Sequence, residues 1–120
     1  MAKVLIVEDD TSIANLYKTE LDLRGHKVQV MDNGTGVIEK IVEFSPDLIL
    51  LDIQLPDKDG LTILKEIKAD PKAKDVKVIV VSNYSDDKNV EAALDLGALD
   101  FIPKFRVVPE ELGEKVEKSL

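Results

Sequence analysis

The chain has 120 residues with 24 acidic and 16 basic side chains, which give a net charge of -8, and it contains no cysteine. These numbers exclude disulfide bonds and argue against direct contact with nucleic acid or a membrane surface, because the chain as a whole repels polyanions. The length predicts a single domain over residues 1–120, and no apolar run approaches the roughly 20 residues that span a bilayer, so we expect a cytoplasmic protein.

The first half of the chain predicts two strands and two helices in alternation. The run KVLIVE, residues 3–8, is short, rich in β-branched side chains and apolar up to its acidic end, as in a strand buried on both faces. A helix follows, with Asp10 or Thr11 as its N-cap. The alternating segment 27–31 predicts a strand with one wetter face, and 36–44 predicts a second helix.

The second half continues the alternation with three strands and three helices. In chain order they are a strand at 47–52, a helix at 60–69, a strand at 76–82, a helix capped by Ser85 and closed by Gly97, a strand at 99–103 and a last helix with Pro109 in its first turn. Helical spacing predicts the buried faces of the first four helices to be Ile13, Leu16, Tyr17 and Leu21; Val37, Ile38, Ile41 and Val42; Leu61, Leu64 and Ile67; and Val90, Ala93 and Leu94. Five βα units with short connections predict an α/β fold, a flavodoxin-like doubly wound (βα)5 three-layer sandwich with a parallel sheet.

Polar residues stand where the predicted strands end. In chain order they are Glu8 and Asp9 after the first strand, Asp52 at the end of the third, Ser82 at the end of the fourth and Lys104 just after the fifth. In a doubly wound sheet the carboxyl ends of the strands form one edge, and ligands bind there. We therefore expect these five side chains to form one functional site.

Three carboxylates on one edge repel one another unless positive charge lies among them. Oxygen ligands without histidine or cysteine suit a hard cation, so the pattern predicts a Mg²⁺ site, and Lys104 supplies a second positive charge. A metal ion and a lysine around a carboxylate, with a hydroxyl nearby, can hold a phosphoryl group on that carboxylate. Asp52 is then the predicted nucleophile.

Four segments carry a resemblance to a known family. The segments VLIVEDD, LILLDIQLPDKDGL, VIVVSN and DFIPK resemble the receiver domain of two-component response regulators, the family of the bacterial chemotaxis regulator, and the resemblance covers the whole chain. It implies the sheet order 2-1-3-4-5. It also implies a phosphoprotein that acts in signal transduction or a phosphorelay, phosphorylating and dephosphorylating itself without being a turnover enzyme.

The resemblance also implies a role for each site residue. Asp52 would accept a phosphoryl group from a histidine kinase or histidine phosphotransfer protein. The ligands of Mg²⁺ would be Asp9, Asp52 and the main-chain carbonyl of Gln54, with Glu8 acting through water. Ser82 and Lys104 would bind phosphoryl oxygens, and Phe101 would turn inward when Ser82 moves. The output would pass to a downstream protein, or to a second copy in a phosphorylation-dependent dimer, through the fourth helix, fifth strand and fifth helix.

Several residues beside the site differ from the residues that the family usually has there, or are expected to affect how long the phosphoryl group lasts. Phe105 replaces the usual proline after the lysine, so we expect a trans peptide bond there, and Asn83 replaces a small residue. The resemblance implies that Gln54 and Tyr84 occupy positions that control the lifetime of the phosphoryl group. Elsewhere, we expect Asp57 and Asp59 to be solvated or capping residues of a turn, and the only histidine, His26, to be a loop residue.

The residues of the chain disfavour three functions other than a phosphorylation switch. A Mg²⁺-dependent phosphatase with an aspartyl nucleophile would carry a second acid two residues after it, where this chain has Gln54. An interaction module without phosphorylation would not need the complete set of acids, hydroxyl and lysine. An FMN carrier would need a phosphate-binding loop before the first helix, and the chain has neither that loop nor a tryptophan.

Overall fold

The computed structural model describes residues 1–83, 87–104 and 107–120, and it shows strands and helices in strict alternation. The elements are β1 (Lys3–Val7), α1 (Thr11–Leu23), β2 (Lys27–Met31), α2 (Val37–Phe44), β3 (Leu48–Asp52), α3 (Gly60–Ala69), β4 (Lys77–Ser82), α4 (Asp87–Asp95), β5 (Asp100–Pro103) and α5 (Pro109–Ser119). The predictions for Tyr84, Ser85 and Phe105 concern residues outside the described ranges.

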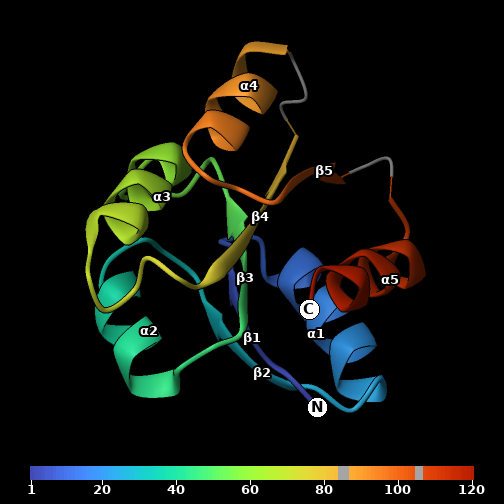
Figure 1. Ribbon diagram of the computed structural model, residues 1–120. Coiled ribbons are helices and arrows are strands. Elements are labelled where there is room, and N and C mark those ends of the chain that lie inside the picture. Colours follow the sequence, from blue (N-terminus) through green and yellow to red (C-terminus); the bar gives the residue numbers. More distant parts are fainter. Residues whose placement is uncertain (84–86, 105–106) are drawn as a thin grey trace.

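The sheet has the predicted topology. Its five strands pair in parallel in the order β2-β1-β3-β4-β5. Helices α1 and α5 cover one face, and α2, α3 and α4 cover the other (Figure 1). Because the chain winds outward from β1 to β2 and then crosses back to β3, the order reverses between β1 and β3, which is where a doubly wound sheet binds its ligands. The flavodoxin-like fold is confirmed.

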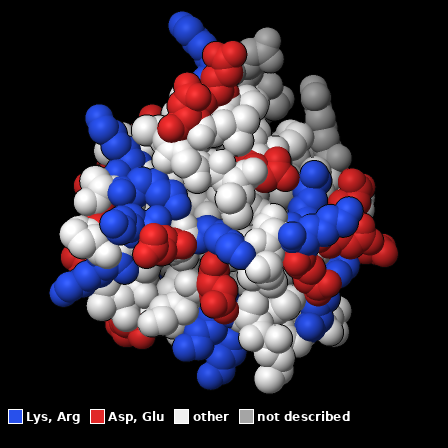
Figure 2. All heavy atoms as spheres, in the orientation of Figure 1, with Lys and Arg blue, Asp and Glu red and all other residues white. Residues whose placement is uncertain are grey.

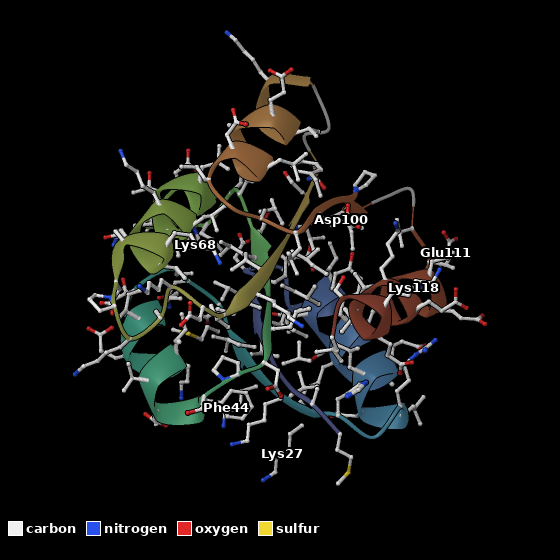
Figure 3. The ribbon with its side chains drawn as sticks, in the orientation of Figure 1. Lys27, Phe44, Lys68, Asp100, Glu111 and Lys118 are labelled. Atoms are coloured by element: carbon white, nitrogen blue, oxygen red, sulfur yellow. The ribbon has the colours of Figure 1, made fainter. Side chains whose placement is uncertain are left out.

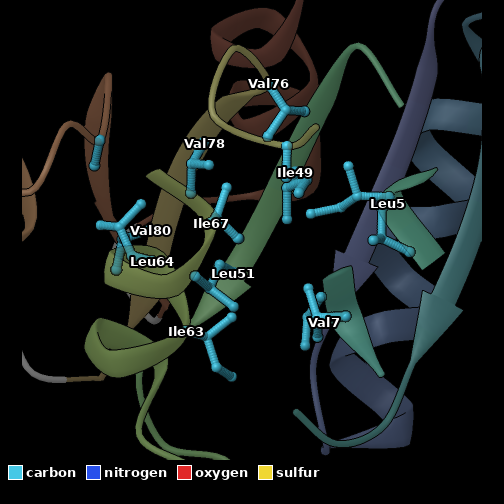
Figure 4. Close-up of a cluster of buried hydrophobic side chains, with 14 of the residues drawn as sticks. Leu5, Val7, Ile49, Leu51, Ile63, Leu64, Ile67, Val76, Val78 and Val80 are labelled. Carbon is cyan, nitrogen blue, oxygen red and sulfur yellow. The ribbon is translucent and has the colours of Figure 1, made fainter. Parts of the chain in front are cut away.

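The central strands are buried on both faces, as their continuous apolar sequences predict. Side chains of a strand point alternately to the two sides, so Val4 and Ile6 pack under α1 and α5 while Leu5 and Val7 pack on the other side. Figure 4 shows this second cluster, in which α3 places Ile63, Leu64 and Ile67 against β1, β3 and β4. All five residues of β3 are buried, whereas β2 at the edge is largely exposed.

Three of the side chains predicted to be buried are exposed instead. Leu16, Val42 and Leu94 keep 55%, 49% and 46% of their surface. Leu16 and Val42 each adjoin a residue that is buried, Tyr17 and Ile41. One helical step turns a side chain by about 100°, so where the buried stripe is narrow, as on α1 and α2, the position next to a buried residue faces solvent. Those predictions were wrong because the apolar pattern was wider than the contact with the sheet.

The loops at the carboxyl edge are shaped by caps and one tight glycine. Asp10 caps α1 by accepting a hydrogen bond from the Ile13 amide at 3.1 Å, as predicted. Asp59 caps α3 through the Leu61 amide at 2.7 Å. A side chain on Gly60 would collide with the carbonyl oxygen of Asp52, so the chain can turn this closely behind the site only with glycine.

The last helix follows the charge pattern expected from its dipole. Pro109 lies in the first turn of α5 with Glu110 and Glu111, and Lys118 lies in the last turn (Figure 3).

Among the helices of the described ranges, none combines the length and the apolar character needed to cross a bilayer.

Candidate functional site

The structure brings the residues predicted for the site to the carboxyl edge of the sheet. Glu8 follows β1, Asp52 ends β3, Ser82 ends β4 and Lys104 follows β5. All four residues are buried, and none of them keeps more than 8% of its surface. Burying charged groups is unfavourable unless they pair with one another. The contacts within this group therefore determine whether the arrangement is tolerated.

Lys104 joins the two buried carboxylates. Its Nζ lies 2.5 Å from Oε1 of Glu8 and 2.9 Å from Oδ2 of Asp52. The second oxygen of each carboxylate accepts a backbone N–H, from Asp10 at 3.0 Å for Glu8 and from Gln54 at 3.2 Å for Asp52. In each acid, one carboxylate oxygen thus contacts the lysine and the other accepts a hydrogen bond from the backbone. The strand ends hold both carboxylates facing a single ammonium group.

Burial changes the acid–base properties of this group. Burial raises the pKa of Glu8 to about 7, with the charge of Asp52 acting in the same direction, against the hydrogen bonds from Lys104 and the Asp10 amide. Burial alone would lower the pKa of Lys104, but its hydrogen bonds to Asp52 and Glu8 outweigh burial and raise it. The lysine is therefore held as a cation, and the cluster has an excess of negative charge when both acids are ionised.

Three carboxylates are close enough to share a cation. Single oxygens of Glu8, Asp9 and Asp52 lie within 4.8 Å of one another, with Asp9 exposed and the other two buried. A set of ligands made only of oxygen suits a hard divalent ion that retains water, and the exposed Asp9 leaves the site open to solvent. The residues present therefore fit the predicted Mg²⁺ ion. A bound cation would also offset the negative charge of the three carboxylates.

A small cavity lies directly over Asp52. It has a volume of 190 Å³ and is lined by Asp9, Asp10, Ile13, Asp52, Gln54, Ser82, Asn83 and Lys104. Gln54 and Asn83 are exposed at its mouth. Phe101 does not line this cavity; it is half-buried on β5 and packs against the core under α2, α3 and α4. A larger hollow of 840 Å³ lies at the opposite edge of the sheet and includes none of the predicted site residues.

Sequence reasoning missed two long-range contacts. Asp57 is not simply solvated: it accepts hydrogen bonds from the Gly34 amide and the Thr35 hydroxyl, on the loop after β2. His26 is more than a loop residue, because its ring accepts the Ala2 amide at 3.1 Å and contacts Glu117 on α5. No local signal in the sequence could reveal either contact, since both join segments at least 22 residues apart.

The fold and site together define a doubly wound α/β domain with a buried acidic and lysine site at its switch point. The model of the response regulator receiver domain family matches residues 4–117. The chain belongs to this family, and is a receiver domain of the kind found in two-component response regulators.

Known proteins agree with this assignment. The transcriptional regulatory protein KdpE of Staphylococcus aureus is 41% identical over 103 residues, which are 86% of this chain and 43% of that protein. A receiver domain protein from Methanospirillum hungatei has a TM-score of 0.87 at 33% identity, covering 98% of this chain and 92% of that one. The activated N-terminal receiver domain of Klebsiella pneumoniae RstA has a TM-score of 0.87 at 30% identity, covering 98% and 97%. The chain spans about half the length of the curated relatives it matches.

Proposed function

We propose that this domain is a phosphorylation-activated switch in which Asp52 accepts a phosphoryl group in a Mg²⁺-dependent reaction. The donor is the phosphohistidine of a histidine kinase or of a histidine phosphotransfer protein. The observation that carries the proposal is the contact of 2.9 Å between Lys104 Nζ and the buried Asp52 carboxylate, at the floor of an open cavity. A carboxylate fixed by a lysine at the switch point of the sheet is suited to nucleophilic attack.

The transfer forms one bond and breaks another. An oxygen of Asp52 attacks phosphorus, the bond from phosphorus to the imidazole nitrogen breaks, and that nitrogen leaves with the electron pair. Each Asp52 oxygen accepts one of the hydrogen bonds from Gln54 and Lys104 and keeps a second lone pair, with which it can attack phosphorus. Lys104 and the hydroxyl of Ser82 are the groups of this chain that can then bind the phosphoryl oxygens.

The residues for the metal are Asp9, Asp52 and the main-chain carbonyl of Gln54, with Glu8 acting through a bound water. When bound there, Mg²⁺ supplies the positive charge that offsets repulsion between the carboxylates and the incoming phosphoryl group. The close approach of the Glu8, Asp9 and Asp52 oxygens supports this placement. Asp52 thereby serves both the metal and the phosphoryl group.

The signal would pass from Ser82 to the face formed by α4, β5 and α5. Ser82 ends β4 with none of its surface exposed, and Phe101 lies on the neighbouring strand, paired with Val80. If Ser82 is drawn toward the phosphoryl group, space opens for the half-buried Phe101 to turn inward. Phosphorylation would then shift the population of this face from the state with Phe101 outward to the state with Phe101 inward. A downstream protein or a second copy of the chain would bind the altered face.

The remaining parts of the proposal concern the setting of the domain. We propose a single receiver domain over residues 1–120, in the cytoplasm, with no direct nucleic-acid or membrane contact of its own. The net charge of -8 supports the lack of direct contact with nucleic acid or a membrane, and on the face in Figure 2 acidic side chains lie among the basic ones. A phosphatase is disfavoured by Gln54, which cannot act as the second acid.

The direct test is labelling with acetyl phosphate and Mg²⁺, read as the mass gain of one phosphoryl group. We expect wild type to be labelled and Asp52→Asn to remain unlabelled. Asp59→Asn is the matched control, because asparagine also caps helices and the residue stands on the same loop. Labelling of Asp52→Asn at the wild-type rate, or no labelling of wild type, would contradict the proposal.

A further inference from the structure

A second contact at the carboxyl edge joins the loop after β3 to the loop after β2. The carboxylate of Asp57 accepts two hydrogen bonds from the neighbouring loop, one on each oxygen. Oδ1 accepts the Gly34 amide at 2.7 Å, and Oδ2 accepts the Thr35 hydroxyl. The Thr35 amide in turn donates to Asn33 Oδ1 at 2.9 Å, which holds this loop in the turn that presents both donors.

The two loops also fit closely against each other at this point. Gly34 is buried, and a side chain there would collide with Ile63 and press against Lys58. The two hydrogen bonds also lower the pKa of Asp57, the bond from the Thr35 hydroxyl having the largest effect. The carboxylate therefore stays ionised, and the contact is a charged one, although Asp57 is exposed.

Asp57 lies at the tip of the loop between β3 and α3, beyond the contacts that close the base of that loop. The base of the loop is closed by the Gly60 amide, which donates to the Ile53 carbonyl at 2.6 Å, and by a bridge between Gln54 and Asp59. Residues 55–58 form the tip beyond this base. A loop held only at its base can pivot there, and Gln54 is part of that base. The tip itself is attached at three places: Leu55 packs against the core, Lys58 forms an exposed ion pair with Glu66 on α3 at 2.8 Å, and Asp57 bonds the loop after β2. Among these attachments Asp57 is the one that ties the tip to the loop after β2 and opposes a pivot away from it.

We propose that Asp57 is a positioning residue which, by anchoring its loop to Gly34 and Thr35, holds the Gln54 carbonyl in place and sets the affinity of the site for Mg²⁺. This rests on the proposed function, because it takes Gln54 as a metal ligand. Groups that hold a metal ligand in its orientation commonly affect the affinity for the ion without touching it.

Two substitutions separate anchoring from charge. Asp57→Ala removes the acceptor and also one negative charge near the site, whereas Thr35→Val removes the hydroxyl donor with nearly the same shape and no charge change. Asp70→Ala is the matched control: Asp70 accepts the Lys72 amide at 2.8 Å on the loop before β4, so the charge change is the same and the site is distant. Urea unfolding of each variant shows that it is folded.

The first measurement is the Mg²⁺ dissociation constant, from amide chemical shifts in the absence of any phosphodonor. We expect Thr35→Val and Asp57→Ala each to raise it, up to about tenfold for Asp57→Ala, and Asp70→Ala to leave it unchanged. The double variant should match Asp57→Ala alone, because Asp57→Ala already removes the bond from Thr35 together with the bond from Gly34. The Gly34 amide shift reports directly whether the contact is lost.

The second measurement is the labelling rate with acetyl phosphate at saturating Mg²⁺. It should equal the wild-type rate in both variants, because only metal affinity depends on the anchor. A wild-type Mg²⁺ constant in Thr35→Val overturns the inference, even if Asp57→Ala shows a change, because the Thr35 hydroxyl is one of the two donors that make the anchor. Failure of wild type itself to bind Mg²⁺ overturns the metal site of the proposed function, and this inference with it.

Discussion

Two groups of charged side chains in this molecule are built from the same chemistry but differ in burial. At the carboxyl edge, Lys104 joins Glu8 and Asp52, with side chains that retain 3 to 5% of their surface. At the other end of α1, Arg24 joins Glu20 at 2.7 Å and Glu117 at 3.3 Å, with exposures between 21 and 43%. The second group fastens α1 to α5, and Arg24 also donates to the Glu110 carbonyl.

The difference in burial separates the two groups in energy and in use. Water screens the group around Arg24, so each of its ion pairs adds little and can be lost at small cost. In the group around Lys104 the charges have lost their hydration and depend on one another. A buried set of mutually dependent charges responds strongly when a phosphoryl group or a cation arrives. Under the proposed function, the domain places its reactive charges where burial is least favourable for folding.

The largest effect should come from breaking the buried group. Lys104→Met leaves two buried carboxylates without their cation, and we expect the free energy of unfolding to fall by about 3 kcal/mol. The matched variant Arg24→Met should cost much less, because its partners remain hydrated. Urea unfolding in metal-free buffer measures both. Equal losses in the two variants would show that burial does not distinguish the groups.

Removing one acid from the buried group should have the opposite sign. Glu8→Gln removes a charge that burial disfavours and that Asp52 repels, so we expect stabilisation by about 1 kcal/mol without metal. The same change should weaken Mg²⁺ binding, since one of the clustered carboxylates is lost. Urea unfolding with a chelator, followed by a Mg²⁺ titration, tests both parts. A less stable Glu8→Gln protein would mean that the ion pair to Lys104 outweighs the burial cost.

A third change tests the exposed group from the side of α5. The Arg24 side chain crosses α5 over Gly113, where an added Cβ would collide with it. Gly113→Ala should displace Arg24 from its partners, but alanine favours the helix by about 1 kcal/mol, so we expect a net change near zero. In an Arg24→Ala background the same substitution should stabilise by about the full propensity gain. Thermal unfolding of the four proteins gives the comparison, and no gain in that background would contradict it.

The smallest effect concerns pH. The hydrogen bond with His26, together with Arg24, lowers the pKa of Glu117 below its usual 4.5. A carboxyl with a depressed folded pKa stabilises the protein above its unfolded pKa, and this contribution is lost as pH falls through the folded pKa. Melting temperatures from pH 6 to pH 3 should therefore fall slightly more steeply for wild type than for Glu117→Gln. Parallel curves would show that Glu117 contributes nothing measurable.

Much of the fold follows from local patterns that survive folding unchanged. The strands KVLIV and LILLD each contain a run of four apolar residues, and such runs are typical of strands that helices cover on both faces of a sheet. The caps Asp10 and Asp59 are equally local, since each bonds an amide two or three residues away. The helical faces were less predictable, as Leu16 shows, because the width of a buried stripe depends on what packs against it.

For this protein the sequence by itself determined the order of strands and helices, the family, and the set of acids, hydroxyl and lysine that ends the strands. Those features depend on residue type and on spacing along the chain. Only the tertiary structure decided that Lys104 bonds both Glu8 and Asp52, and that Asp57 reaches Thr35. Such contacts join residues between 22 and 96 positions apart, and they exist only once the sheet has brought its strand ends and loops together.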